Sequence, residues 1–357
     1  MKVRAAISEG DGSFAIETIE LGPPGAHEVL IEIKASGVCH TDWDSLRWGK
    51  RLVLGHEGAG TVAAVGSAAS CFRPGDRVML NWAIPCGQCF QCERGKQNIC
   101  EHRGTVPDER YHHPRGPMNA SFSLGTMATF ALVPGAAVMP LPDEVPYEVA
   151  AIMGCAVMTG FGSAVNAARV EAGSTVVVLG CGGVGLSVIL GALHQNAGRV
   201  IAIDVNPARL ELARQFGATE TLLAHRDDAG LLRTAAEVKL RTNDRGADYA
   251  FECTAIPELG PAPLAMIRSA GTAVGVSGIE KVVPVDMELF EWDKIYINPL
   301  YGACRPDRDF PLLSRLYSNG SLPLDAMVTR TYALDDLQLA FEDMHFGINA
   351  KGVLVFE

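Results

Sequence analysis

The stretch from Ser174 to Asp204 constrains the fold more than any other part of the chain. It begins with a β-branched run, Thr175 to Leu179, which is too short for a helix and predicts a buried strand. Gly180, Gly182 and Gly185 follow where a helix should start. In this pattern one glycine permits a sharp turn, one lets the backbone approach a pyrophosphate, and one lets the helix pack tightly on the strand. The phosphate would then meet the N–H groups of the helix N-terminus.

An acidic residue stands where such a fold places its ribose contact. The apolar run Val200 to Ile203 predicts a second strand, which ends at Asp204, about 20 residues after the last glycine. A carboxylate there would hydrogen-bond the ribose of NAD and repel the extra phosphate of NADP. We therefore expect a dinucleotide-binding domain that prefers NAD. Asn206 and Arg209 could accommodate a phosphate, although Asn206 followed by Pro207 is also the usual start of a helix.

Length and charge limit the kinds of partner. A chain of 357 residues predicts two domains at about 150 residues each. The balance of 30 basic and 41 acidic residues gives a net charge of −11, which argues against nucleic acid or an anionic membrane as the main partner. The first ten residues, MKVRAAISEG, lack the apolar core of a signal peptide, so we expect a cytoplasmic protein. Two charge-free windows, 149–168 and 174–193, are rich in glycine and hydroxyl residues and do not predict membrane spans.

The texture of the sequence divides the chain into three parts. Residues 1–156 contain short alternating runs separated by Pro and Gly, which predict a mainly antiparallel β domain. Residues 157–299 alternate strand-like and helix-like segments and predict a doubly wound parallel sheet. Residues 300–357 return to a mixed pattern. The clearest predicted elements outside the dinucleotide motif are strands at 29–33, 60–65, 77–80, 249–252, 272–276 and 352–356 and helices at 311–318 and 334–344.

Four cysteines predict a structural metal lobe at residues 82–102. Cys86, Cys89, Cys92 and Cys100 follow the pattern C-x2-C-x2-C-x7-C. Four thiolates at this spacing can close a tetrahedral zinc site. An iron–sulfur cluster is the alternative, but the last gap is longer than in ferredoxins and no proline follows the last cysteine. Ten cysteines without an export signal fit metal ligands or core residues better than disulfides.

Six motifs carry a resemblance to a known family. GVCHTD, GHEGAG, the four-cysteine lobe, GCAVMTG, GCGGVGLSV and VIAID occur in this order. Over essentially its whole length the chain resembles the zinc-dependent medium-chain alcohol dehydrogenases. LNWAIPCGQC and YGACRPDRDFPLL make it most similar to the branch that contains the thiol-dependent formaldehyde dehydrogenases. The resemblance implies an α/β protein with a GroES-like catalytic domain, built from both ends of the chain, and a Rossmann domain.

The same resemblance implies a catalytic zinc site. Cys39, His56 and Cys155 are its expected ligands, with a fourth position open for water or alcohol. Two thiolates and a neutral imidazole would give the site no net charge, so the zinc remains a Lewis acid. Glu57 corresponds to an acid that can ligate transiently, and Asp42 to the carboxylate that orients the histidine. Taken singly, each of these residues would more often be an ordinary buried or capping residue. Together with the structural zinc predicted for the four-cysteine lobe, this predicts two zinc ions per chain.

Proton transfer and cofactor contacts are also implied by the family. Thr41 would accept the alcohol proton. Many relatives pass it to a histidine three positions later, where this chain has Asp44, and an exposed aspartate with a pKa near ~4 is a poor base at neutral pH. The expected cofactor-binding residues are His40, Thr159, Gly180, Gly182, Gly183, Val184, Gly185, Asp204, Asn206, Arg209, Val274 and Lys351. Among these, His40 and Lys351 would meet cofactor phosphates.

The resulting hypothesis is an NAD-linked zinc alcohol dehydrogenase that reversibly oxidises a primary, bulky or aromatic alcohol to an aldehyde. The alternatives are a formaldehyde dehydrogenase acting on a thiol adduct, a dismutase with tightly bound NAD, and a non-enzymatic zinc protein. We expect a homodimer, with a tetramer as the alternative. Trp82 and Leu124 are candidates for the pocket wall or for the core. A short loop with Arg47, Lys50 and Arg51 could recognise a carboxylate on the substrate or could simply be solvated.

Overall fold

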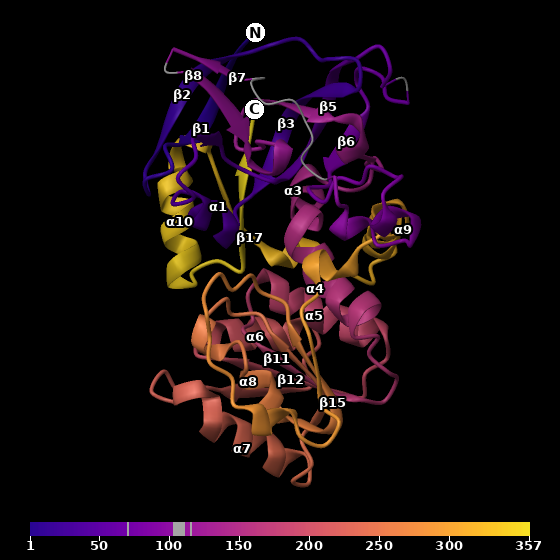
Figure 1. Cartoon of the computed structure of the whole chain (residues 1–357), viewed down its shortest axis with the longest axis vertical. Coiled ribbons are helices and arrows are strands. Elements are labelled where there is room, and N and C mark those ends of the chain that lie inside the picture. The colour runs from indigo at the N-terminus through magenta and orange to yellow at the C-terminus, as the bar shows by residue number, and fades with distance from the viewer. Residues whose placement is uncertain (70, 103–110, 115) are drawn as a thin grey trace. The chain divides into compact units, whose positions relative to one another are not determined.

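The chain forms two compact units (Figure 1). The computed structural model describes residues 1–69, 71–102, 111–114 and 116–357. One unit comprises Met1–Cys155 and Arg305–Glu357, and the other comprises Ala156–Cys304. The first boundary lies one residue from the predicted boundary after residue 156. The second lies five residues from the predicted boundary after residue 299. The first unit is thus built from both ends of the chain.

A closed barrel and a seven-stranded sheet make up the first unit. Nearly all strand pairs are antiparallel, and the C-terminal strand joins the sheet beside β3, with Val353 opposite Gly37. The mainly antiparallel β fold predicted for this part is therefore confirmed. The barrel contains, in order, β1 (Lys2–Ser8), β2 (Phe14–Leu21), β7 (Tyr111–His113), β8 (Gly116–Ala120) and β4 (Leu52–Val53). The sheet contains β10 (Val138–Pro140), β6 (Arg77–Leu80), β5 (Glu57–Val65), β3 (Glu28–Gly37), β18 (Lys351–Val355) and β17 (Val328–Tyr332), with β9 (Phe130–Pro134) paired to β3.

Alternation in β3 shows why this sequence forms a sheet. Val29, Ile31 and Ile33 point to one face and are buried in the same apolar cluster. Burying each side chain contributes about 1.5–3 kcal/mol relative to exposure. The next strand, β5, pairs with β3 and carries Glu57 at its first position. The core of the sheet therefore fixes where this acidic residue emerges.

Short helices connect and cover these strands. They are α1 (His40–Ser45), α2 (Phe90–Glu93), α3 (Tyr147–Ile152), α9 (Pro306–Ser318) and α10 (Leu337–Phe346). The amphipathic pattern of the sequence predicted a helix over 311–318, whereas α9 begins five residues earlier. Pro306 takes the first helical position, which proline favours, and Pro311 lies inside the helix. The helix is therefore longer than predicted at its N-terminal end.

The second unit is a parallel sheet of six strands with helices between them. Its strand order is β13 (Glu220–Leu223), β12 (Arg199–Asp204), β11 (Thr175–Leu179), β14 (Ala247–Glu252), β15 (Ile267–Gly275) and β16 (Ile295–Ile297). The helices are α4 (Met158–Gly162), α5 (Gly183–His194), α6 (Pro207–Gln215), α7 (Leu232–Arg241) and α8 (Ala262–Met266) (Figure 1). This order reverses direction next to β11, as in doubly wound dinucleotide-binding folds. The Rossmann prediction is confirmed.

A long apolar helix runs from Tyr147 to Ala167 and contains α3 and α4. It is long and apolar enough to pass a test for a membrane span, but 78% of the apolar window is buried inside the molecule. Such burial is typical of a core helix. Between α3 and α4 the helix widens into a π-helical turn, Met153–Val157. Turns of this kind often occur at functional sites, and this one carries Cys155.

Candidate active site and metal centres

Four side chains of the first unit meet at one point. The ligand atoms of Cys39, His56, Glu57 and Cys155 all lie within 4.8 Å of one another. Cys39 immediately precedes α1, His56 and Glu57 lie at the start of β5, and Cys155 lies on the π-helical turn. The structure thus brings together residues that are more than a hundred positions apart in the sequence.

Gly37 makes room for one of these side chains. A Cβ atom at Gly37 would lie 2.0 Å from Oε2 of Glu57. No real Cβ contact is that short, so any other residue at this position in β3 would displace the carboxylate. The glycine of the GVCHTD motif therefore serves the site by its lack of a side chain.

Asp42 fixes the orientation of His56. The Nδ1–H of His56 donates to Oδ1 of Asp42 at 2.9 Å, and both side chains are buried. The other oxygen of Asp42 accepts the backbone N–H of Cys39 at 3.2 Å. Although burial opposes a charge on the ring, Asp42 raises the pKa of His56 well above its ordinary value. Because Nδ1 is engaged, Nε2 is the nitrogen left to act as a ligand.

The two thiols of the cluster have pKa values shifted in opposite directions. The neighbouring thiol of Cys155, supported by His56, lowers the pKa of Cys39 well below its ordinary value although burial opposes this. The thiol of Cys39, together with burial, raises the pKa of Cys155. A divalent ion at this point would bind both sulfurs as thiolates, since metals bind the deprotonated form.

The donor set fits zinc. Two sulfurs and one imidazole are the ligands of a zinc site that keeps an open position. In addition, Oε2 of Glu57 is buried and has no hydrogen-bond partner among the described residues, as expected for an oxygen that lies beside a cation. The four residues therefore suit a zinc ion with an additional carboxylate nearby.

Lys351 lies in the interior beside this cluster. Its ammonium group donates to Oε1 of Glu57 at 2.6 Å and to the carbonyl of Val38 at 2.8 Å, and the side chain is 7% exposed. Burial raises the pKa of Glu57 to about 7, although Lys351 opposes the shift. The phosphate contact that the family resemblance implied for Lys351 stays a prediction. In the structure its ammonium group has these two protein partners.

Removing the ammonium group should destabilise the fold. We expect Lys351→Met to lower the free energy of unfolding by about 3 kcal/mol, because it leaves a buried carboxylate without its partner. Urea unfolding of the metal-loaded protein measures this. Lys34→Met breaks a partly exposed pair with Glu32, 2.9 Å long, and should cost less than about 1 kcal/mol. Equal losses in the two variants would contradict a special role for the buried pair.

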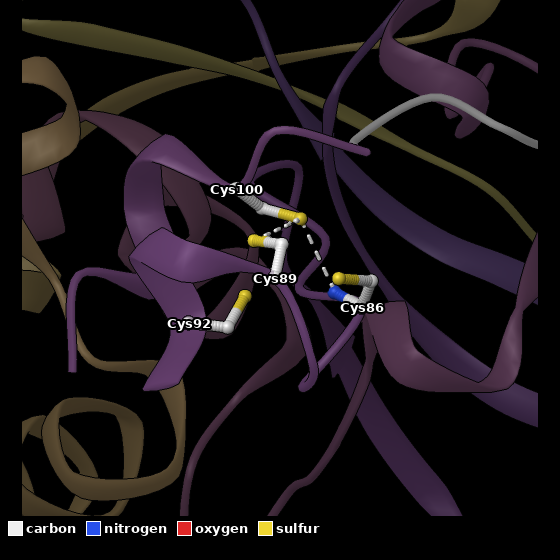
Figure 2. Close-up of side chains that lie close together, drawn as sticks. All are labelled: Cys86, Cys89, Cys92 and Cys100. Atoms are coloured by element: carbon white, nitrogen blue, oxygen red, sulfur yellow. Dashed lines mark hydrogen bonds between the residues drawn. The ribbon is translucent and has the colours of Figure 1, made fainter. Parts of the chain in front are cut away.

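The four cysteines of the lobe also converge. Their sulfur atoms lie within 4.8 Å of one another, and Figure 2 shows them turned towards a common centre. Backbone N–H groups point at them: Cys86 and His102 donate to the sulfur of Cys100 at 3.3 and 3.4 Å. Such bonds stabilise thiolates and are typical of metal-bound cysteines. Four sulfurs with no further ligand fit a closed structural zinc site.

Loss of one lobe ligand should act on stability before activity. We expect Cys92→Ser to lower the free energy of unfolding by at least about 3 kcal/mol, because a structural zinc contributes folding free energy. Differential scanning calorimetry and the zinc content per chain measure this. Cys71→Ser is the control, since Cys71 is exposed and lies outside both cysteine clusters. A Cys92→Ser protein with unchanged stability would argue against a structural metal.

Aromatic rings lie beside His56. The ring of Phe122 is 5.1 Å from the imidazole of His56, 5.1 Å from Trp82 and 6.0 Å from Trp48. Phe122 has a left-handed backbone, with φ of 50°, which costs about 1–2 kcal/mol for a residue other than glycine. Strain of this kind concentrates at functional sites. Sequence reasoning missed Phe122 and Trp48, and no local pattern signals a left-handed phenylalanine.

Leu124 is fully buried in the apolar core of the sheet, against which Trp82 packs. This burial favours the core-packing interpretation of Leu124 over the pocket wall. Trp82 is half-buried and contacts Phe122, which places its ring next to the site.

The residues expected to move a proton lie on α1. Thr41 is half-buried in the first turn, two positions after Cys39. Partial desolvation and the charge of Cys39 raise the pKa of Asp44, and Arg47 and His345 oppose the shift. Asp44 itself is exposed, as the sequence suggested. His40 is exposed, and its ring lies 5.7 Å from that of His345.

The cations of the short loop are partly engaged. Nε of Arg51 lies 3.3 Å from Glu9, and Arg51 also hydrogen-bonds His113 at 3.0 Å. The guanidinium of Arg47 lies over the ring of Trp43, 5.2 Å from its centroid. Arg51 therefore supports the barrel rather than the recognition of a carboxylated substrate.

In the second unit the glycine loop has the geometry that its sequence requires. Gly180 adopts φ of 86°, and a Cβ atom on Gly185 would lie 1.8 Å from the carbonyl oxygen of Gly180. A Cβ atom on Gly182 would meet nothing within 4 Å. The loop is thus tight at its two ends and open in the middle, at the N-terminus of α5. An anion can approach the backbone there.

Asp204 lies at the carboxyl end of β12. Its Oδ2 accepts the N–H of Cys181 at 2.8 Å and its Oδ1 accepts the N–H of Asn206 at 2.8 Å. The carboxylate is therefore fixed in position and links the glycine loop to the start of α6. Each oxygen retains a lone pair for a further donor.

The remaining cofactor candidates are spread over the second unit. Asn206 caps α6, because its side chain accepts the N–H of Ala208 at 2.9 Å. Arg209 is half-buried on the same helix, and Val274 is fully buried in β15, so only the backbone of Val274 could contact a ligand. Thr159 accepts a hydroxyl from Ser163 with its carbonyl. Gly183 and Val184 form the first turn of α5.

Comparison with known proteins agrees with this fold and these clusters. The alcohol dehydrogenase GroES-like domain matches residues 25–143, and the zinc-binding dehydrogenase domain matches residues 183–316. The chain is 33% identical over 371 residues to S-(hydroxymethyl)glutathione dehydrogenase of Escherichia coli O1:K1, covering 99% of this chain and 100% of that protein. These matches define a zinc-binding dehydrogenase.

Solved structures agree. An alcohol dehydrogenase zinc-binding domain protein from Burkholderia ambifaria superposes with a TM-score of 0.90 at 28% identity, covering 100% of this chain and 99% of that one. Benzyl alcohol dehydrogenase from Acinetobacter calcoaceticus gives 0.88 at 29% identity, covering both chains completely. The chain belongs to the zinc-dependent medium-chain alcohol dehydrogenase family. It is an oxidoreductase, and the resemblance inferred from its motifs is confirmed.

Proposed function

We propose that this enzyme reversibly oxidises a primary aromatic alcohol to its aldehyde, with NAD as hydride acceptor and two zinc ions per chain. The observation that carries the substrate class is the aromatic group beside His56. The ring centroids of Trp82 and Trp48 lie 5.1 and 6.0 Å from that of Phe122. A pair of aromatic rings contributes about 0.5–1.5 kcal/mol beyond the burial of its surface. A substrate with an aromatic ring would therefore bind beside these side chains better than an aliphatic one.

The chain's own residues have distinct roles in this proposal. Cys39, His56 and Cys155 would hold a zinc ion, which when bound supplies a Lewis acid for the substrate oxygen. Asp42 keeps the imidazole in one tautomer and orientation through its 2.9 Å hydrogen bond. Thr41 accepts the alcohol proton with its hydroxyl, as the family resemblance implies. The raised pKa of Asp44 brings this carboxyl closer to the range in which it can take up a proton from the relay.

NAD is the proposed cofactor because Asp204 lies at the end of β12, fixed by two backbone N–H groups. Its negative charge favours ribose hydroxyls over a phosphate. Asn206 and Arg209, which could bind the extra phosphate of NADP, are less suited to that role. The side chain of Asn206 is engaged as a helix cap, and Arg209 is half-buried.

A second candidate substrate is a formaldehyde adduct of a thiol. It is favoured by the likeness to S-(hydroxymethyl)glutathione dehydrogenase. The engagement of Arg51 with Glu9 and His113 speaks against it, since this removes one of the cations that could meet a carboxylate. A dismutase would differ in holding NAD through gel filtration.

The test is a substrate panel followed by NADH absorbance. We expect kcat/KM for benzyl alcohol to exceed that for ethanol and for S-(hydroxymethyl)glutathione. Phe122→Ala should lower kcat/KM for benzyl alcohol by about tenfold to a hundredfold and change the value for ethanol by less than about threefold. The control is Phe346→Ala, because Phe346 is 77% exposed. Equal losses for both alcohols would mean that Phe122 acts only on folding or metal placement.

The edge of the parallel sheet carries a candidate surface for self-association. The edge strand β16 and the segment before it expose large apolar side chains, with Met287 71%, Trp292 74% and Ile295 53% exposed. An exposed edge with apolar side chains favours pairing with a second copy, so we propose a homodimer. Light scattering of Trp292→Glu should show a shift towards monomer.

We also propose a cytoplasmic location, because all ten cysteines are free and the two clusters require reduced thiols.

A further inference from the structure

A cavity of about 570 Å³ lies in the first unit between α9 and the segment that follows β10. No residue of either cysteine cluster lines it. Its walls are mainly apolar: Met139, Leu141 and Pro142 form one side, and Pro306, Phe310 and Pro311 form the other. Cavities of this size and character commonly hold small molecules.

The wall that follows β10 is held rigidly. The guanidinium group of Arg77 donates to the carbonyls of Pro142, Asp143 and Val145. The same group lies over the ring of Tyr147, 4.5 Å from its centroid. β10 itself is paired with β6 in the sheet. The cavity is therefore preformed and does not depend on a mobile loop.

A residue that lines this cavity carries a buried, unbonded hydroxyl group. Ser314 lies on α9 and is 3% exposed, yet its Oγ makes no hydrogen bond to any residue that the structure describes. A serine or threonine inside a helix usually donates to the carbonyl four residues earlier. In this chain Ser187 donates to Gly183 and Thr242 donates to Val238 in this way. Ser314 departs from that pattern, so the hydrogen-bonding capacity of its buried hydroxyl is unused.

The helix offers a second polar group on the same side. Pro311 has no N–H, so the carbonyl of Asp307 cannot receive the usual helical hydrogen bond from it. Asp307 also lines the cavity. This carbonyl lies about two turns, or ~10 Å, from Ser314 along the helix, so it is a separate acceptor and cannot share one polar group of a ligand with the Ser314 hydroxyl.

The charges around the cavity balance. Glu144 accepts the hydroxyl of Ser318 at 3.2 Å, and Asp307 lies 3.8 Å from Arg305. Arg315, also on the cavity wall, makes no ion pair with the residues that the structure describes. Two carboxylates therefore stand against two guanidinium groups, which favours neither an anionic nor a cationic ligand.

We propose that this cavity is a second binding site, for neutral ring compounds that carry one hydroxyl group. The ring occupies the apolar space between Phe310 and the prolines. The hydroxyl group bonds to Oγ of Ser314. The site is separate from the zinc clusters, and binding there does not require turnover.

The test uses 2-naphthol as the probe and the metal-loaded full-length enzyme labelled with ¹³C in its methionine methyl groups. The resonance of Met139, assigned with Met139→Leu, should shift and saturate as 2-naphthol is added. Ser314→Ala should weaken this binding by roughly five- to tenfold, because one hydrogen bond is lost. Ser318→Ala is the matched control, one turn along the same helix with its hydroxyl already bonded to Glu144, and it should bind as the wild type does.

Further arms of the experiment separate the alternatives. Naphthalene should bind Ser314→Ala and wild type equally, and naphthalene-2-carboxylate should bind more weakly than 2-naphthol. Ser314→Ala should be at least as stable to heat as the wild type, since it removes an unpartnered buried hydroxyl. Unchanged 2-naphthol affinity in Ser314→Ala, tighter binding of the carboxylate, or no shift of the Met139 resonance would overturn the proposal. A Met139 resonance that moves with protein concentration alone would identify a second copy of the chain as the occupant and would also overturn it.

Discussion

Replacing Cys39 by serine is expected to lower kcat/KM by at least roughly a thousandfold and to reduce the metal content from two zinc ions per chain to one. The reason lies in the cluster geometry. Cys39 supplies one of two sulfurs that lie within 4.8 Å of each other and of the His56 and Glu57 ligand atoms. A serine hydroxyl is a harder donor that is not ionised at neutral pH, so the remaining groups would hold zinc weakly. Steady-state kinetics and atomic absorption measure the two effects.

The Cys39→Ser variant tests whether the two metal centres have separate roles, one in catalysis and one in stability. The lobe cysteines form an independent cluster, so the remaining zinc and the thermal stability should be largely retained in Cys39→Ser. Cys92→Ser should show the opposite order of effects, and Cys71→Ser neither. A Cys39→Ser enzyme with full activity, or one that loses both zinc ions, would contradict the assignment of a catalytic and a structural centre.

The sequence was most informative where backbone geometry and periodicity act together. The strand Thr175–Leu179 has the predicted bounds, because a short β-branched run between two turns has few alternatives. Gly180 and Gly185 could be assigned because no other residue fits a positive φ or a 1.8 Å approach to a backbone oxygen. The spacing of Cys86, Cys89, Cys92 and Cys100 likewise predicted the lobe, whereas the cluster of Cys39, His56 and Cys155 was implied by the family resemblance. Both sets of ligand atoms converge in the structure.

The sequence was least informative where long-range packing decides. Nothing local shows that the helix widens into a π-helical turn at Met153–Val157, which carries Cys155. The left-handed backbone of Phe122 results from its surroundings and not from its own preference. Lys351 was placed at a phosphate by resemblance, whereas β18 carries it into the interior, 2.6 Å from Glu57. Leu124 is apolar and could suit a pocket wall or the core equally well. Only its complete burial in the structure favours the core.

The second large effect is expected at the cofactor loop. Asp204→Asn should lower kcat/KM with NAD by about tenfold and raise it with NADP by about tenfold, so that the ratio changes about a hundredfold. The substitution removes the charge that repels a ribose phosphate and weakens the acceptor for the ribose hydroxyls. It also leaves one amide oxygen where two carboxylate oxygens now accept the N–H groups of Cys181 and Asn206. Part of the loss with NAD therefore reflects a less well-ordered loop, and this part must be measured separately.

Asp228→Asn supplies the matched control. Asp228 is another buried aspartate of the second unit, and its carboxylate accepts the backbone N–H groups of Arg233 and Thr234 at 3.0 and 2.9 Å. Although burial opposes the shift, the hydroxyl of Thr234, which donates at 2.7 Å, and these two N–H groups lower the pKa of Asp228 to about 2. The variant should lose stability without changing the ratio of NAD to NADP activity, because Asp228 lies at the start of α7 and not at the glycine loop. If the two variants change that ratio equally, or if the wild-type enzyme already prefers NADP, then Asp204 does not select the cofactor. In that case the proposal for NAD fails, while the assignment of the zinc clusters is unaffected.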